Sequence, residues 1–124
     1  MSTDRELLEL AANAAGVDGL YAENSYRKSN GILIADRLWN SFTNDGDALR
    51  LAVKLRMTIR PEPAAVCAGW SIGERGAPTR DGLGPWFWKE WYRAPGDELA
   101  ATRRAIVRAA AAIGAGNTDG GKHE

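Results

Sequence analysis

The sequence has 124 residues, of which 44% are hydrophobic and 26% charged, and its formal net charge is zero. This length suits one domain with its own core, and the absence of any apolar run approaching roughly 20 residues excludes a membrane-spanning helix. Residues 1–47 carry a net charge of −4 and residues 48–113 one of +5. That local bias favours an anionic partner, but the chain is far from the pI above about 9 that marks nucleic-acid-binding domains.

The N-terminal segment predicts a helix. Thr3 and Glu6 have the spacing of a capping box, in which the two side chains satisfy backbone amides of the first turn. Gly16 suits the left-handed residue that ends many helices. Between them lies an apolar stripe at helical spacing, made of Leu7, Leu8, Ala11, Ala14 and Ala15. The acidic start does not resemble a secretory signal, so we expect a cytosolic protein.

The next two elements are a hairpin and a helix. Residues 20–35 predict a β-hairpin with a turn at Ser29-Asn30-Gly31. The turn and cap residues Thr43, Asn44 and Asp45 then precede a second helix, predicted over roughly residues 45–56. Its apolar positions follow helical spacing and are Ala48, Leu49, Ala52, Val53 and Leu55.

Three strands and a helix complete the pattern. A strand starts at residues 57–59, where Pro61 and Pro63 interrupt it, and "AAVCAGWSI" and "PWFWKEWYR" predict two more. The glycine-rich residues 73–84 between them predict a hairpin loop. A final helix runs from about Asp97 to Ile113, before Gly114. Residues 114–124 have almost nothing apolar to bury, so we expect a disordered tail.

These elements predict one α+β domain over residues 1–113, in the order α-β-β-α-β-β-β-α. Three helices of this length can cover both faces of a mainly antiparallel sheet. The fold class that follows is an α-β-α sandwich with one sheet of about four or five strands.

Three helical segments carry a resemblance to a known group of proteins. They are "LWNSFTNDGDALRLAVKL" (38–55), "ELAATRRAIVRAAAAIG" (98–114) and, more weakly, "ELLELAANAAGV" (6–17). Together they resemble small phage- and prophage-encoded proteins with a phage α-β-α sandwich domain. The resemblance implies an accessory protein made inside an infected bacterium. It carries no catalytic residues to this chain, and residues 73–92 lie outside it.

The sequence lacks the residue sets of common enzymes. Its one cysteine, Cys67, lies in an apolar run, and its one histidine, His123, lies in the polar tail. These cannot supply a Cys/His metal set or a histidine-dependent nucleophile. There is also no phosphate-binding loop of the Walker type and no dinucleotide-binding glycine motif. Asp45 and Asp47 could hold a metal, but carboxylates at a helix start more often act as caps.

The segment "PWFWKEWY", residues 85–92, contains five of the ten aromatic residues. On a strand, Trp86, Trp88, Glu90 and Tyr92 face one way, and Phe87, Lys89 and Trp91 face the other. Helices on both faces would place both rows in the core. However, three indole N–H groups need partners when buried, and exposed tryptophan rings can stack planar ligands or anchor protein contacts.

We therefore predict a non-catalytic phage accessory protein that acts by binding in the cytoplasm of an infected bacterium, with no cofactor and no metal. The candidate binding residues are Arg75, Arg80, Trp86, Trp88, Lys89 and Trp91. In the sharpest hypothesis, the protein sequesters a small anionic nucleotide-type ligand, such as a host antiviral defence signal. Trp86 or Trp88 then stacks the base, and Arg75 and Arg80 contact phosphate.

The alternative is a protein-protein inhibitor or adaptor with the tryptophan cluster as its hot spot and Arg104 and Arg108 at the rim. An enzyme that uses only Asp, Glu, Arg and Tyr is a third class left open. We expect neither a membrane partner nor long nucleic acid, and the sequence is compatible with a homo-oligomer.

Overall fold

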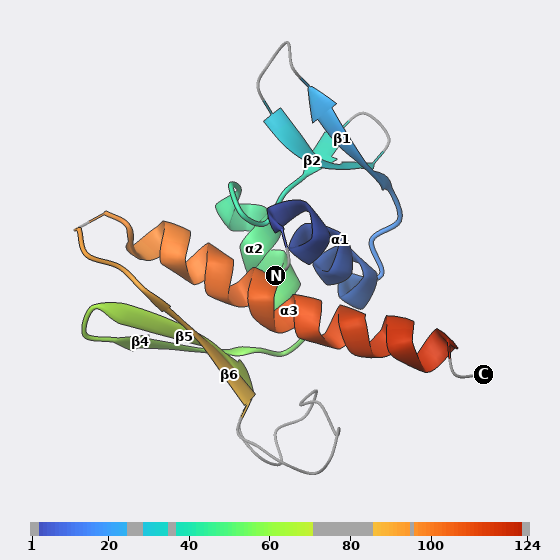
Figure 1. Ribbon diagram of the computed structural model, residues 1–124. Helices are drawn as coiled ribbons and strands as arrows, with labels where there is room; N and C mark the ends of the chain where they lie inside the picture. The colour runs from blue at the N-terminus through green and yellow to red at the C-terminus, as the bar shows by residue number, and fades with distance from the viewer. Residues whose placement is uncertain (1–2, 25–28, 35–36, 71–85, 95, 123–124) are drawn as a thin grey trace.

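The computed structural model describes residues 3–24, 29–34, 37–70, 86–94 and 96–122. Within them the fold is α+β, with three helices and two separate three-stranded antiparallel sheets (Figure 1). The helices are α1 (Asp4–Ala15), α2 (Asp45–Lys54) and α3 (Glu98–Lys122). Sheet A contains β1 (Leu20–Asn24), β2 (Ser29–Ile34) and β3 (Arg37–Trp39), and sheet B contains β4 (Thr58–Glu62), β5 (Ala65–Trp70) and β6 (Trp86–Trp91).

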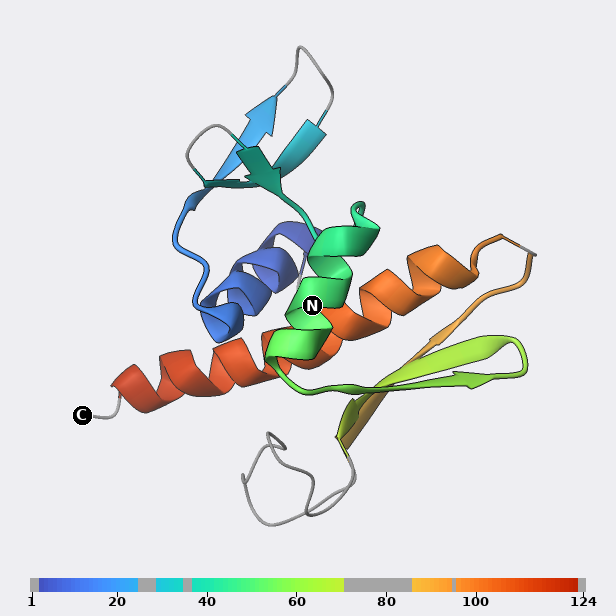
Figure 2. The same ribbon diagram turned by 180° about the vertical axis from the view of Figure 1, so that it is seen from behind.

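The helices form the central layer, with one sheet on each side (Figures 1 and 2). The predicted single sheet of four or five strands between helical layers is therefore not what the structure has. In each sheet, every strand pairs with its neighbour in the sequence, and no pairing joins the two sheets. Many positions of α3 are small and buried, which lets this helix pack against neighbours on several sides. These buried positions include Ala101, Ala105, Val107, Ala109 and Ala110.

The predicted ends of the first two helices are largely correct. The Thr3 hydroxyl accepts the Glu6 backbone N–H at 3.1 Å, and Gly16 ends α1 in the left-handed conformation, with φ of 70°. Asn44 is the N-cap of α2, and its side chain accepts the Asp47 N–H at 2.8 Å. The α2 helix ends at Lys54, two residues before the predicted end.

Sheet A differs from the predicted hairpin in two details. The predicted turn at Ser29-Asn30-Gly31 lies inside β2, where Gly31 pairs with Ala22. A side chain at Gly31 would collide with the Trp39 carbonyl oxygen, at 2.6 Å from an added Cβ, so glycine permits β3 to approach closely. The sequence pattern missed β3 because it is only three residues long.

Sheet B matches the three predicted strands. Pro61 is accommodated because β4 is an edge strand, where a missing N–H can face away from the sheet. The central strand β5 is buried along its whole length. The predicted loop at residues 73–84 lies outside the described residues.

The α3 helix continues well past the predicted stop at Ile113 and reaches Lys122. The predicted end of this helix at Ile113 is therefore wrong, and the disorder of residues 114–124 stays a prediction. Gly114 is not a helix-ending residue here. It lies where α3 crosses α1, and an added Cβ would come within 1.9 Å of the Leu10 carbonyl oxygen. Glycine is needed for this close backbone contact.

Candidate functional site

The two rows of β6 have different surroundings. Trp88 pairs with Ala68 and Glu90 with Val66, so both belong to the face of sheet B that packs on α3. The Trp88 ring packs edge-on against Trp70, with a centroid distance of 6.3 Å and an interplanar angle of 85°. Trp70 is fully buried, and its indole N–H donates to the Leu55 carbonyl at 2.9 Å. Trp88 and Tyr92 of this row pack against the core.

The other row lies on the outer face of sheet B, where no helix of the described chain covers it (Figures 1 and 2). The Arg60 guanidinium lies 4.4 Å from the Phe87 ring centroid, and the Lys89 ammonium lies 5.1 Å from that of Trp91. Lys89 also forms a 2.8 Å ion pair with Glu62 of β4. Cations are attracted to the faces of aromatic rings, so these side-chain contacts stabilise the outer face of sheet B.

Trp91 is the exposed aromatic side chain of this face. Its exposed fraction is 71%, whereas Trp39 and Trp70 are buried and Trp88 is half-buried. Leaving so large an apolar ring exposed forgoes the free energy of burying it. Such residues, next to polar neighbours, are typical centres of binding surfaces.

Charge in the middle of the outer face is balanced around Glu62. Hydrogen bonding to Lys89 lowers the pKa of Glu62, and the same contact raises the pKa of Lys89. Burial raises the pKa of the Cys67 thiol, which donates to Glu62 over 3.5 Å. The thiol therefore stays protonated at neutral pH and is a poor nucleophile.

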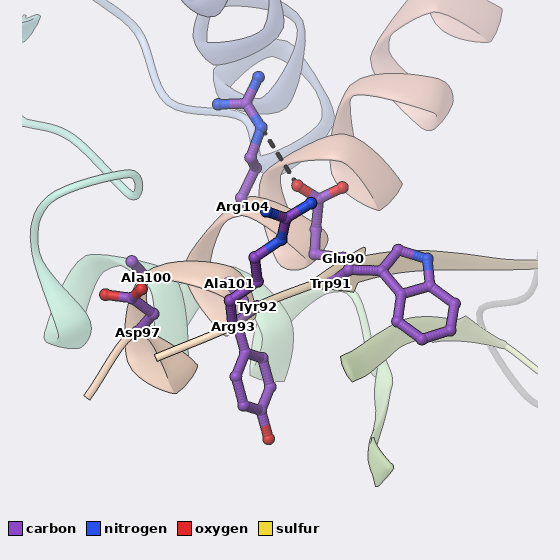
Figure 3. A pocket seen from close by; sticks show the side chains of 8 residues that line it. All are labelled: Glu90, Trp91, Tyr92, Arg93, Asp97, Ala100, Ala101 and Arg104. Atoms are coloured by element: carbon purple, nitrogen blue, oxygen red, sulfur yellow. Dashed lines mark ion pairs between the residues drawn. The ribbon is translucent and has the colours of Figure 1, made fainter. Parts of the chain in front are cut away.

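A pocket of about 470 Å³ opens between the end of β6 and the start of α3 (Figure 3). Its lining residues are Glu90, Trp91, Tyr92, Arg93, Asp97, Ala100, Ala101 and Arg104. The small side chains of Ala100 and Ala101 on α3 leave room for this pocket. The exposed side chains of Arg93 and Asp97 have no ion pair or side-chain hydrogen bond with any described residue. They are available to a ligand of either charge.

Glu90 fixes one side of this pocket. It pairs with Arg104, with Nε and Oε1 3.2 Å apart, and with Arg108. Arg104 also reaches Asp4 of α1 at 3.1 Å. Figure 3 shows Arg104 and Glu90 facing each other, while the indole of Trp91 points elsewhere. Both arginines are therefore structural partners of Glu90 and do not form a free cationic rim.

The predicted site residues are only partly brought together. Lys89 and Trp91 are neighbours on the outer face, but Trp88 packs on the opposite, core-facing side of the same strand. Arg75, Arg80 and the side chain of Trp86 lie outside the described residues. Sequence reasoning missed Arg93 and Asp97, although Arg93 continues the alternation of Lys89 and Trp91 and could have been found from it.

The Asp45 and Asp47 carboxylates have a structural role at the start of α2, as expected for acidic residues at the beginning of a helix. Asp45 forms an ion pair with Arg103 at 2.6 Å. Asp47 is fully buried and accepts the Asn40 backbone N–H and the Arg50 guanidinium, each at 3.0 Å. No group of three or more His, Cys, Asp or Glu side chains among the described residues is placed to hold a metal ion.

Within the described chain, no helix combines the length and the apolar character that crossing a membrane requires. Comparison with protein-family models, with curated proteins and with solved structures found no match to this chain.

Proposed function

We propose that this protein is a non-catalytic phage accessory protein that binds another protein, with Trp91 at the centre of the contact. The observation that carries the proposal is the 71% exposure of Trp91 on a sheet face that none of the described helices covers (Figure 1). Tryptophan is enriched among interface hot spots because its ring buries a large area with few rotatable bonds. The resemblance of the helical segments to phage proteins supports the phage origin and a location in the cytoplasm of an infected bacterium.

Several features favour a protein partner over a small ligand. The pocket beside Trp91 is open, and its lining carries both signs of charge. Small-molecule sites are usually concave and mostly apolar, with only a few polar groups. Trp88, one of the residues expected to stack a base, packs against Trp70. An open sheet face with the exposed side chain of Trp91 matches the anatomy of a protein contact better.

A displayed library of random short peptides tests this proposal without requiring knowledge of the partner. The baits are the wild type, Trp91→Ala and Val53→Ala. Val53 is a matched control because it is also an exposed apolar side chain, with 68% exposure, and lies on α2. We expect shared enriched sequences on the wild type and Val53→Ala that are lost on Trp91→Ala. Equal enrichment on all three baits, or no enrichment at all, would contradict the proposal.

A second candidate is sequestration of a small anionic ligand of the nucleotide type, such as a host defence signal. It is favoured by the position of the unpaired Arg93 in the same pocket as Trp91. The Trp91 ring would stack the base, and the Arg93 guanidinium would bind phosphate.

Calorimetry with a panel of cyclic and linear nucleotides tests this second candidate. We expect heat of binding with one member, lost in both Trp91→Ala and Arg93→Ala and kept in Val53→Ala. Ligand recovered unchanged after denaturation argues against turnover by an enzyme. The absence of heat with every nucleotide rules the candidate out.

A further inference from the structure

Among the strands that the structure describes, β6 has a neighbour on one edge only. Sheet B has the order β4-β5-β6, so β5 occupies only one side of β6. The Tyr92 N–H donates to the Ala64 carbonyl at 3.0 Å, on the β5 side. In an antiparallel pair, alternate residues direct their backbone groups to the same side. Trp88 and Glu90 therefore face β5 with their backbones, and Phe87, Lys89 and Trp91 direct theirs away from the sheet.

The pocket opens at the end of this strand, beside the start of α3. Its lining includes Glu90 and Tyr92 from the core-facing row and Trp91 from the outer row. No residue of β4 or β5 lines it, so a strand added beside β6 would reach the pocket without displacing β5.

We propose that an extended segment of the partner protein adds to β6 as a fourth strand of sheet B. This inference rests on the proposed function, since it specifies how a protein partner bound at Trp91 is held. The backbone of the segment bonds to the outward groups of Phe87, Lys89 and Trp91. Its side chains then alternate between the outer face and the pocket beside Ala100 and Ala101.

The exposed row indicates the chemistry of the segment. Along the edge it reads Phe87, Lys89, Trp91 and, one step past the strand, Arg93. Lys89 already pairs with Glu62 of β4 on the β5 side, and an added strand would lie on its other side, whereas Arg93 has no ion pair with any described residue. A complementary strand places acidic side chains opposite Lys89 and Arg93 and an apolar one opposite Trp91. The partner segment is therefore an extended peptide in which acidic, apolar and acidic residues occupy alternate positions.

A second copy of this chain fits the edge poorly. A two-fold antiparallel pairing of β6 with β6 through the outward groups of Phe87, Lys89 and Trp91 places Lys89 directly opposite Lys89, and like charges in opposed positions destabilise a sheet. One contact already exists at the edge, where Arg108 Nη1 donates to the Lys89 carbonyl at 3.4 Å. That bond is long, and an amide of the added strand replaces it.

The probe is a capped synthetic peptide with glutamate, valine and glutamate at alternate positions and threonine between them. A second peptide carries lysine in place of both glutamates. Amide hydrogen exchange, followed by NMR, reports the strand pairing directly. With the acidic peptide we expect exchange of the Phe87, Lys89 and Trp91 amides to slow by at least about tenfold, while the Trp88 and Glu90 amides, already facing β5, stay unchanged.

Charge reversal provides the matched variants. Arg93→Glu should weaken binding of the acidic peptide by about tenfold and strengthen binding of the lysine peptide. Arg56→Glu, which changes an exposed arginine at the end of α2, should alter neither. N-methylation of the peptide amides that face β6 should abolish binding.

Three results would overturn strand addition. They are binding that leaves the outward amides unprotected, equal affinity for both peptides, and no binding of the acidic peptide. Library sequences lost on Trp91→Ala would still support protein recognition, so failure of this inference is distinguishable from failure of the proposed function.

Discussion

Asp47 shows how a single buried carboxylate organises the start of α2. It has no solvent exposure, and it accepts hydrogen bonds from the Asn40 backbone and from Arg50. Asp47→Ala should lower the free energy of unfolding by about 2 kcal/mol, because the partly buried Asn40 N–H loses this acceptor. Arg50→Ala should cost less than about 1 kcal/mol, since its side chain is 66% exposed. Urea denaturation measures both free energies of unfolding. Equal losses in the two variants would contradict the role of Asp47 as the acceptor for Asn40.

The Lys89–Glu62 pair makes a pH-dependent contribution to stability. The lowered pKa of Glu62 means that the pair stabilises the fold above the unfolded value of 4.5 and that this contribution is lost as pH falls through the folded pKa. We expect Glu62→Gln to have a lower Tm than the wild type at neutral pH and the same Tm at a pH below the lowered pKa of Glu62. A Tm difference independent of pH would show that the charge is not responsible. Thermal denaturation at the two pH values is the measurement.

At the residue scale, the alternation of "PWFWKEWY" predicts its two rows correctly. It does not predict which row is exposed, because that depends on the side of the sheet on which α3 packs. Trp88 and Trp91 are chemically identical in the sequence, yet one contacts Trp70 and the other faces solvent. The alternation also places Arg93 in the row of Lys89 and Trp91, so its position was readable from the predicted strand, but its lack of an ion pair with any described residue was not.

At the element scale, replacing Gly114 with alanine should destabilise the fold, which is the opposite of the usual effect of this change in a helix. In an isolated helix, Gly→Ala stabilises by about 1 kcal/mol. Here the new methyl group would meet the Leu10 carbonyl oxygen at 1.9 Å, so Gly114→Ala should destabilise by about 3 kcal/mol. Ala112→Gly, two residues earlier in α3, should cost about 1 kcal/mol through helix propensity alone. Calorimetric unfolding compares the two, and a stabilised Gly114→Ala variant would disprove the close crossing.

The elements themselves were largely readable from local signals. Thr3, Gly16 and Asn44 act at helix ends through contacts within a few residues, so their pattern is visible in the sequence. Gly114 resembles a helix stop for the same reason, but its actual neighbour is Leu10, more than one hundred residues away. No local rule contains that contact, and the length of α3 was underestimated as a result.

At the scale of the whole molecule, the two sheets should differ in stability. The central strand of sheet B, β5, is buried at all six positions. In β2, the central strand of sheet A, Leu33 is exposed, and its neighbour Leu20 on β1 is 83% exposed. We expect β2 amides to exchange through local opening and β5 amides only through global unfolding. Native-state hydrogen exchange measures this, and equal protection of β2 and β5 would contradict it.

The layer order was the main failure of the sequence analysis. Helix and strand patterns correctly predicted an α+β fold with three helices. They did not show whether helices or strands form the middle layer, because an apolar stripe indicates burial without naming the partner. The alanines spread around α3 were the available signal, since a helix that is apolar on several faces is typical of a central position.

In the outer row of β6, Phe87 contacts Arg60 of β4, and Lys89 contacts both Trp91 and Glu62 of β4. Phe87 and Trp91 do not belong to the buried core, so they can change without disturbing the alanine-rich centre of the fold. Mutations that alter recognition and mutations that alter the core therefore fall on opposite sides of one strand. In such a chain, the exposed binding residues can change as the partner evolves, while the core residues stay the same.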